Sequence, residues 1–331
     1  MDLSIEHFGD IHLHAESVRE WSQTYSQLTS GSVQSSLLQL TGPRFQVFRE
    51  SINQRVVQHG EAPRGRICFA IPLVVPGAAR MQGREADGRS VFVLQGGEEF
   101  MFHMPMGMDM LAFTFDRGTF EQAVASEARP EELDTLLKQP VVQIPADRLD
   151  KSRNRLVGLF EEALLMCETI SAEVESWIQA VLIGEMISLL SDPTCDKHQR
   201  HGSSSGSYIV EKCHQLTVRE KLNPPSVFDL CRRLRISRRS VQNGFRSVAE
   251  TTPVNYIRCI RLNGVRRELM STRVADMTIG DAAAQWGFFH LSHFAADYHL
   301  LFGELPSQTL RLDGYTGRPT VMPGGLQLAD A

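Results

Sequence analysis

The chain has 331 residues, which is enough for two domains of ordinary size. Its 42% hydrophobic and 22% charged residues are typical of a soluble globular protein, and a net charge of -5 does not by itself indicate a nucleic-acid-binding protein. The charge is unevenly distributed, however. Residues 207–312 hold 15 Lys and Arg against 9 Asp and Glu, a net charge of +6, and the rest of the chain carries -11. Only one part of the chain is therefore expected to meet phosphate groups.

No segment of the sequence is expected to cross a membrane. The longest apolar stretch, residues 67–79, is interrupted by Pro72 and Pro76 and is much shorter than the ~20 residues that a span needs. The N-terminus has no basic flank before an apolar run, so no signal peptide is expected. The six cysteines form no C-x-x-C pair, which favours reduced cysteines in a cytoplasmic protein over a disulfide framework or a zinc site.

Residues 41–115 are rich in short apolar runs of the kind that form strands. Runs at 45–48, 66–71, 90–95 and 111–115 are separated by turns that contain Gly and Pro. Such closely spaced strands predict a small antiparallel barrel or sandwich.

Helical periodicity replaces the strand pattern after Asp116. Apolar residues recur at steps of three and four in residues 147–170 and again in residues 172–190, which predicts two helices with an apolar stripe. Neighbouring helices of this kind form an antiparallel hairpin. The stripe can pack against the barrel or form the seam of a dimer, and a wide stripe can do both. A homodimer is therefore expected.

Residues 191–207 have almost no apolar content, and Ser and Gly dominate their end, so they predict a flexible linker. The linker separates an N-terminal regulatory or dimerisation domain (1–190) from a C-terminal domain (208–312), which a tail (313–331) follows. The expected fold class is α+β, with a barrel- or sandwich-like domain that carries a helical hairpin and is joined to an all-α domain.

The C-terminal part contains an internal repeat. The first copy spans residues 226–253 and the second spans residues 278–306. Two equivalent pairs are 52 residues apart: Cys231 and Ala283, and Ile236 and Phe288. Three later pairs are 53 residues apart: Val241 and Phe294, Phe245 and Tyr298, and Pro253 and Pro306. A small residue in a first helix, an apolar turn residue and two apolar residues four apart predict a helix-turn-helix unit in each copy, rather than two unrelated helical hairpins.

The second helix of the first copy presents a polar face. With its apolar pair turned inward, four polar residues lie on the opposite side: Arg239, Gln242, Asn243 and Arg246. Arg can contact guanine through two hydrogen bonds, and Gln or Asn can contact adenine in the same way. Arg238 and the arginines of the preceding helix suit phosphate groups. A charged run is often only a solvated face, but its position on the second helix favours DNA.

Residues 253–271, between the copies, have the apolar periodicity of one long helix. Such a helix would join the two units rigidly. Their second helices are then expected to enter successive major-groove segments about one DNA turn apart.

The segment IGDAAAQWGFFHLSHFAADYHLLFGELPSQTLR (279–311) resembles the signature of the AraC/XylS transcription regulators, and so does the first copy with the helix that follows it. The resemblance covers about residues 208–312. Within the family, QWGFFHL, FAADY and VRRELMS are most similar to the regulators of ethanolamine-utilisation operons. QVFRE (46–50) and CFAIP (68–72) extend that similarity into the N-terminal half.

The resemblance implies a sequence-specific DNA-binding transcription regulator, more often an activator than a repressor, with no catalytic activity and no cofactor. Its implied partners are double-stranded promoter DNA, RNA polymerase, a second copy of the chain and a small-molecule effector. The N-terminal domain would bind the effector or form the dimer. The sequence indicates no effector-binding residue.

The resemblance also places the residues that would read bases: Arg239, Gln242 and Asn243 in the first unit, and Ser292, His293, Ala295 and Ala296 in the second. The second unit departs from the family pattern, because many members have Arg at the position of Ala296 and Lys at that of His299. We therefore expect it to contribute shape fit and phosphate contacts more than hydrogen bonds to bases. The family's turn glycine is present as Gly287, but Arg235 replaces it in the first unit. Arg235 must adopt a strained left-handed conformation or lie in a remodelled turn.

Two other functions are alternatives. One is a ligand-independent regulator whose N-terminal domain only dimerises. The other is a metal-dependent barrel enzyme fused to a DNA-binding domain, with six candidate residues: His12, His14, Glu16, Glu98, Glu99 and His103. The first two histidines precede the predicted strands, and the group lacks a metal-ligand pattern, so the regulator is favoured.

Overall fold

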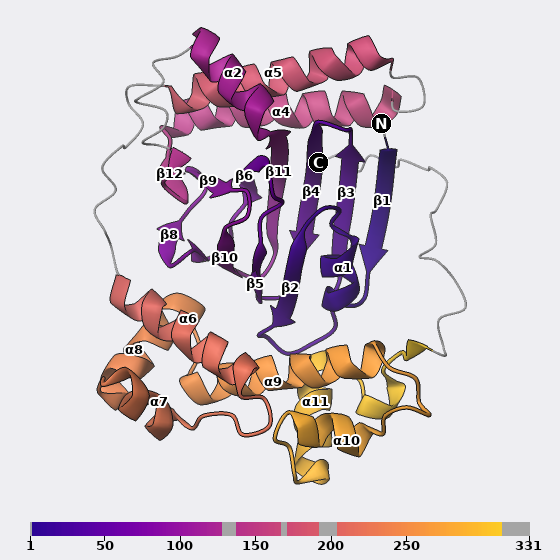
Figure 1. Ribbon diagram of the computed structural model, residues 1–331, viewed down its shortest axis with the longest axis vertical. Helices are drawn as coiled ribbons and strands as arrows, with labels where there is room; N and C mark the ends of the chain where they lie inside the picture. Colours follow the sequence, from indigo (N-terminus) through magenta and orange to yellow (C-terminus); the bar gives the residue numbers. More distant parts are fainter. Residues whose placement is uncertain (1, 128–136, 167–170, 192–203, 313–331) are drawn as a thin grey trace.

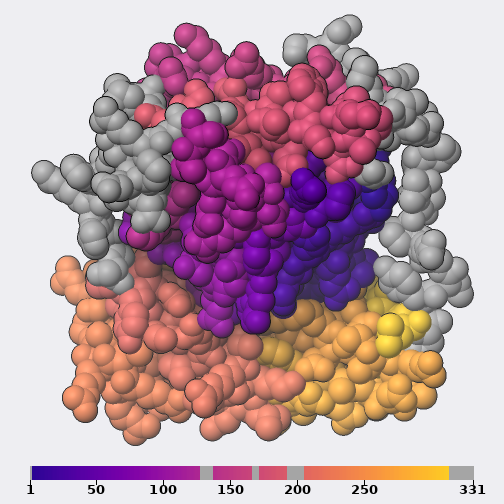
Figure 2. All heavy atoms as spheres, turned by 45° about the horizontal axis from the view of Figure 1, so that its top comes forward, coloured from indigo at the N-terminus to yellow at the C-terminus, as the bar shows by residue number. Residues whose placement is uncertain are grey.

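The structure is a computed structural model that describes residues 2–127, 137–166, 171–191 and 204–312. Two β-sheets form the centre of the molecule, helices cover one side of them, and a helical C-terminal domain lies along the opposite side (Figure 1). Figure 2 shows this C-terminal domain, in orange and yellow, packed against the β-rich domain in indigo and purple. The predicted α+β fold class, with a sandwich-like N-terminal domain and an all-α C-terminal domain, is confirmed.

The strands form one seven-stranded and one five-stranded sheet with antiparallel neighbours. The first sheet has the order β1 (Asp2–Phe8), β3 (Ser35–Thr41), β4 (Phe45–Ile52), β11 (Met108–Asp116), β6 (Arg66–Val74), β9 (Ser90–Gln95) and β12 (Val141–Gln143). The second has the order β2 (Ser22–Gln27), β5 (Val56–Glu61), β10 (Glu99–Met104), β7 (Ala79–Met81) and β8 (Arg84–Ala86).

Strand β11 shows how both faces of the first sheet are covered. Side chains alternate between the faces of a strand, and Leu111, Phe113 and Phe115 enter a core that the sheet shares with the helices. Met108 and Met110, on the other face, enter a core that the two sheets share. Because both faces are buried, β11 is apolar along most of its length.

Helices α2 (Arg117–Glu127), α4 (Ala146–Met166) and α5 (Ala172–Leu190) cover the first sheet. Helices α4 and α5 form the predicted hairpin, and stripe residues such as Leu156, Phe160 and Leu182 are buried in the core of that sheet. Of the two predicted roles of the stripe, packing against the sheet is therefore confirmed. An outer flank stays exposed, with Leu165 at 72% and Trp177 at 57% of their full exposure.

The β-rich region extends beyond the predicted range of 41–115, because β1, β2 and β3 precede residue 41 or begin before it. Strands β1 and β2 lie at sheet edges, where fewer side chains are buried, and β2 has the polar sequence SQTYSQ. Helix α1 (Ile11–Ser17) follows β1, and the carboxylate of Asp10 caps it by accepting from the His12 N–H at 2.7 Å.

The C-terminal domain consists of α6 (Ser204–Arg219), α7 (Val227–Leu234), α8 (Arg238–Ala249), α9 (Pro253–Met270), α10 (Ile279–Gln285), α11 (Leu291–Phe302) and the short helix η2 (Pro306–Gln308). Helix α6 begins inside the predicted linker of 191–207. Residues 192–203 of that linker and the predicted tail, 313–331, lie outside the described residues. Within the described ranges, none of the helices has the length and apolar character to cross a membrane.

Helix α9 passes so close to Trp286 that one position on it must be glycine. A Cβ atom at Gly264 would lie 2.3 Å from the buried Trp286 ring. We predict that Gly264→Ala lowers the free energy of unfolding by about 1–3 kcal/mol, because the clash with a rigid ring outweighs the gain in helix propensity. Urea unfolding measures the change.

Gly158→Ala in α4 is the matched control, since a Cβ atom there would meet nothing within 4 Å. It should leave stability unchanged or raise it slightly. Equal stability of the Gly264→Ala variant and the native protein would contradict the close approach.

Candidate DNA-binding interface

The first helix-turn-helix unit consists of α7 and α8. A capping box begins α7, in which the Ser226 hydroxyl accepts from the Asp229 N–H and the Asp229 carboxylate accepts from the Ser226 N–H. Arg235 ends the helix with φ 54° and ψ 43°, so the left-handed conformation, and not a remodelled turn, replaces the family's glycine. Ser237 then caps α8, as its position in the sequence predicts, by accepting from the Ser240 N–H at 3.0 Å.

Helix α8 has one buried and one exposed face. Val241 and Phe245 are fully buried. The predicted contact residues of this helix all have exposed side chains: Arg238, Arg239, Gln242, Asn243 and Arg246. On the preceding helix, the Arg233 guanidinium contacts Glu220 and that of Arg232 lies 3.5 Å from Asp229. The exposed face therefore combines groups that can pair with base edges and cations that suit phosphate groups.

The second unit, α10 and α11, has the same design. Thr278 and Asp281 form the capping box of α10, and Gly287 has φ 73° in the turn. Phe294 and Tyr298 anchor α11 in the core. The predicted contact residues of this helix are again exposed: Ser292, His293, Ala296 and His299. Ala295, which the resemblance also implied, is half-buried.

The two units differ in charge. Residues 207–252, around the first unit, hold 9 Lys and Arg against 4 Asp and Glu. Residues 271–312, around the second, hold 2 Lys and Arg against 4 Asp and Glu. Only the first unit therefore has the excess of cations that attracts a phosphate backbone.

Helix α9 joins the two units. At its first half, the buried Tyr256 ring packs edge-on against Phe245 of α8, with ring centroids 5.1 Å apart. At its middle, the Arg261 Nε donates to the Trp286 carbonyl at 2.7 Å, and the guanidinium lies 4.1 Å from the centre of the Phe288 ring. Burial lowers the pKa of Arg261 to about 10. These contacts fix each unit to the same helix.

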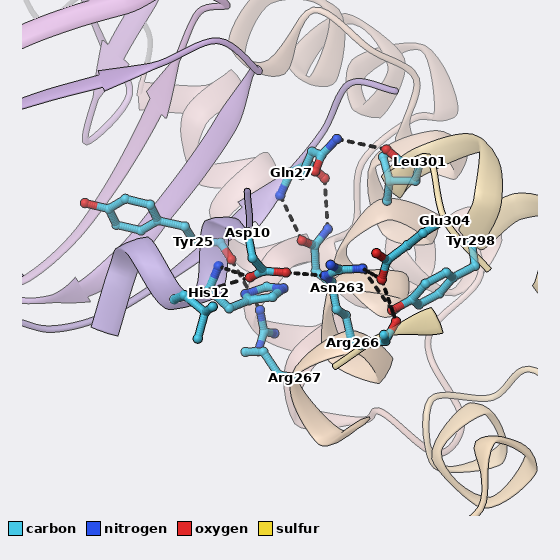
Figure 3. Close-up of polar contacts among 12 residues, drawn as sticks. Asp10, His12, Tyr25, Gln27, Asn263, Arg266, Arg267, Tyr298, Leu301 and Glu304 are labelled. Carbon is cyan, nitrogen blue, oxygen red and sulfur yellow. Dashed lines mark hydrogen bonds and ion pairs between the residues drawn. The ribbon is translucent and has the colours of Figure 1, made fainter. Parts of the chain in front are cut away.

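The N-terminal domain docks on α9 through an edge of β2 (Figure 3). The Asn263 side chain accepts from the Gln27 N–H and donates to the Gln27 carbonyl, each at 2.9 Å, and both residues are buried. The amide of Asn263 thus takes the place of a neighbouring strand. The Gln27 side chain continues to α11, where it donates to the Leu301 carbonyl at 2.8 Å.

A buried charge cluster lies beside this contact. The Arg266 guanidinium of α9 pairs with Asp10 of the N-terminal domain and, at 2.7 Å, with Glu304, and Figure 3 shows it between these two carboxylates. Burial disfavours the charge of Arg266, but Asp10, Tyr298 and Glu304 outweigh this effect and raise its pKa. Burial alone would raise the pKa of Asp10, yet the neighbouring His12 and Arg266 lower it.

Three buried histidines, His12, His103 and His214, also lie where the domains meet. The Tyr256 hydroxyl is 3.3 Å from His103 Nε2 of β10 and 3.1 Å from His214 Nδ1 of α6. His214 stacks on His59 of β5, with centroids 5.3 Å apart. Burial lowers the pKa of His103 and of His12 to about 3, and it lowers that of His214 well below the usual value. The neutral form of each of these three rings is therefore favoured at physiological pH.

A cavity lies between the two sheets. Its lining is mostly aromatic and aliphatic, and the side chains include Trp21, Tyr25, Phe92, Phe100 and Phe102. At one side, the buried Glu50 carboxylate accepts from Tyr25 Oη at 2.6 Å and from Gln58 Nε2 at 2.8 Å. Neither Lys nor Arg is among the lining residues. The cavity therefore suits an apolar compound that is neutral or positively charged.

The candidate residues of the metal-enzyme alternative do not form one metal-binding group in the described residues. His14 lies 3.1 Å from Glu50 and 2.8 Å from Ser35, whereas His103 contacts Tyr256 of the other domain. Glu16, Glu98 and Glu99 have exposed side chains. In the described part of the chain, no group of three or more His, Cys, Asp or Glu side chains could hold a metal ion.

Apart from Ala295, the predicted contact residues thus lie exposed on two helices that are fixed to α9. Their contact with DNA stays a prediction. Sequence reasoning missed the domain contact, since Asn263 and Arg266 are ordinary members of a helical pattern. It also missed Phe289, directly before α11, whose side chain is 73% exposed. The one-residue difference between the two copies at the turn was the available signal.

Known proteins are similar to parts of this chain. A family model described as a helix-turn-helix domain matches residues 230–312. A probable thc operon regulatory protein of Rhodococcus erythropolis is 35% identical over 88 residues, which make up 27% of this chain and 26% of that protein. XylDLEGF operon transcriptional activator 2 of Pseudomonas putida is 35% identical over 113 residues, 34% of this chain and 72% of that protein.

The chain spans about a quarter of the length of the first of these relatives. Among solved structures, the AraC-like transcriptional activator CuxR is similar, with a TM-score of 0.40 and 15% identity over 77% of this chain and 93% of that one.

The buried histidines predict a pH dependence of stability. Their pKa values are lower in the folded protein than the ordinary value of about 6.5, so unfolding takes up protons below that pH. Stability should fall as the pH drops below 6.5, by about 1.4 kcal/mol at pH 5.5 for each of His12 and His103, and His214 should add to the fall. Urea unfolding at pH 7.5 and 5.5 measures the difference.

His103→Gln should remove about 1.4 kcal/mol of this dependence, because it removes one of the titrating groups. His299→Gln, at an exposed position, is the control and should leave the dependence unchanged. Stability that stays constant between pH 7.5 and 5.5 would show that these histidines do not titrate with the fold.

Proposed function

We propose that this chain, which belongs to the AraC/XylS family of transcription regulators, binds specific promoter DNA through α8 and α11 and activates transcription there. The supporting observation is the pair of helix-turn-helix units of one design on α9, the first of which exposes Arg239, Gln242 and Asn243. The chain would act in the cytoplasm, without catalytic activity, through domains at 1–190 and 208–312. RNA polymerase is its proposed protein partner at the promoter.

The first unit would supply most of the affinity. Its arginines neutralise phosphates and release counterions, so binding should depend steeply on salt. For about six phosphate contacts, we predict that the full chain binds its operator roughly a thousandfold more weakly in 200 mM than in 50 mM salt. Fluorescence anisotropy with labelled DNA measures the dissociation constants. Binding that is indifferent to salt would refute phosphate contact.

The two recognition helices should contribute unequally to sequence specificity. Arg239→Ala or Gln242→Ala is expected to relax sequence preference at one end of the site, because two-point contacts to a base discriminate by about 1–3 kcal/mol. Ser292→Ala should change specificity little, since it removes one short hydroxyl. His299→Lys should strengthen binding to all sequences by adding a phosphate contact.

These variants are compared on operators that differ by single bases. If Ser292→Ala erased the preference while Arg239→Ala left it intact, the roles of the two helices would be reversed.

The N-terminal domain would sense a small molecule in the cavity between its sheets. Its aromatic lining and the buried Glu50 suit an apolar or cationic compound. The motifs QWGFFHL, FAADY and VRRELMS make a relationship to ethanolamine regulators the more specific proposal. Ethanolamine, a small cation, is therefore the first compound to test in this cavity, by thermal shift of the full chain, and cobalamin, which is too large for the cavity, tests for binding elsewhere on the chain. A domain that only dimerises would show no shift with any compound of a broad panel.

The exposed flank of the α4–α5 hairpin would form the dimer. Trp177 and Leu165 are large apolar residues whose side chains are exposed to solvent in the monomer. We predict that Trp177→Glu converts a dimer to a monomer, as measured by light scattering. Leu222→Glu, at an apolar position 65% exposed outside the hairpin, is the control and should stay dimeric. A native protein that is monomeric at high concentration would refute the interface.

A further inference from the structure

We infer that the second unit recognises thymine methyl groups in the major groove, and that Phe289 makes the principal contact. This inference rests on the proposed function, because it names what α11 reads once the chain lies on DNA. It concerns a residue outside the predicted set of contact residues.

The surface of the second unit is apolar where a recognition helix meets DNA. Phe289, directly before α11, is 73% exposed, and Leu291 and Leu300 on the helix are 50% and 65% exposed. Ala296 and Ser292 lie on the exposed face between them. Helix α11 contains no Lys or Arg. The face therefore offers methyl, methylene and ring groups, together with a hydroxyl and two imidazoles, and no permanent cation.

Phe289 owes its position to a difference between the two copies. In the first unit, the half-buried turn residue Ile236 is followed at once by Ser237, which caps α8. In the second, the equivalent Phe288 is followed by Phe289 and only then by His290, the first residue flanking α11. The Phe288 ring packs inward, 5.3 Å from that of Phe294. The additional residue thus projects its ring outward at the start of the recognition helix.

The chemistry of the groove selects the target. The C5-methyl group of thymine is the apolar group on the base edges of the major groove, and apolar side chains distinguish thymine by contact with it. Arginine or lysine would be needed to read guanine through two hydrogen bonds, and α11 has neither. An apolar recognition face is therefore matched to thymine.

The position of α11 favours DNA over a protein as the binding partner of its apolar face. Helix α11 has the same place in its unit as α8, and both units are fixed to α9, which with 18 residues is about 27 Å long. The two recognition helices are thus held at fixed positions on one helix, as binding to successive groove segments requires. When the cations of the first unit engage the phosphates, α11 is brought to the next groove segment. The second unit, with 2 Lys and Arg against 4 Asp and Glu, then needs no electrostatic attraction to the DNA phosphates of its own.

The test uses thymine and deoxyuridine, which pair identically and differ by the one methyl group. The full-length protein first selects its site from random DNA, and the positions relaxed by Arg239→Ala mark the half bound by α8. Each thymine of the other half is then replaced by deoxyuridine. Burial of one methyl-sized group corresponds to about a fourfold change in affinity. We expect at least one replacement there to weaken binding about fourfold.

Phe289→Ala should weaken binding to the thymine site and abolish the difference between thymine and deoxyuridine. Phe228→Ala is the matched control, because this α7 side chain is also 73% exposed and lies on the other unit. It should keep the full difference. Both substitutions are at the surface, and unchanged thermal unfolding confirms that the variants fold.

Three outcomes would overturn the inference. Deoxyuridine without effect anywhere in the second half would exclude methyl recognition while leaving the proposed function intact. A difference that persists in Phe289→Ala would assign it to another residue. Phe289→Ala that keeps DNA binding but loses transcription with purified RNA polymerase would identify the face as a protein contact. Failure to recover any site would instead overturn the proposed function, and this inference with it.

Discussion

The guanidinium of Arg266 is the charge on which the arrangement of the two domains depends. It is buried on α9 and is compensated by Asp10 from the N-terminal domain and Glu304 from the C-terminal domain. A buried ion pair adds little net stability compared with apolar packing, but one partner left alone is strongly unfavourable. The cluster therefore disfavours every docking position in which Asp10 does not reach Arg266. Since α9 also carries both helix-turn-helix units, the same contact sets where the N-terminal domain lies relative to α8 and α11.

Strand β2 extends this constraint into the sheets. Its Gln27 pairs with Asn263 of α9, and its Tyr25 lines the cavity and donates to the buried Glu50. The two residues lie on the same face of one short edge strand, so a displacement at Tyr25 changes the position of Gln27. A compound that displaced β2 would therefore act on α9 through hydrogen bonds that tolerate little change in geometry. It would shift the docking of the two domains only if it bound the displaced strand with a different affinity.

Periodic features could be predicted from the sequence, and isolated contacts could not. The repeat of apolar pairs such as Val241 and Phe245 predicted both helix-turn-helix units, because a helix with one buried face has apolar residues at regular intervals in its sequence. The edge strand β2 shows no such periodicity, because its buried residues, Tyr25, Ser26 and Gln27, are consecutive and mostly polar. The pairs Gln27–Asn263 and Asp10–Arg266 join residues 236 and 256 positions apart, and one polar residue in each element carries no pattern. The exposed side chains of α8 and α11 agree with the sequence, and their contact with DNA stays a prediction.

The charge difference between the units gives them separate physical roles. Phosphate neutralisation is long-ranged, depends on salt and is nearly independent of sequence, so the cationic first unit is suited to bring DNA to the protein. Methyl and ring contacts act only at van der Waals distance and respond weakly to salt, so an apolar second unit contributes only after α9 has placed it in the groove. A rigid α9 makes these steps dependent on each other. If α9 holds the two recognition helices in successive groove segments, sequences that lack the second contact would retain only the phosphate and base contacts of the first unit.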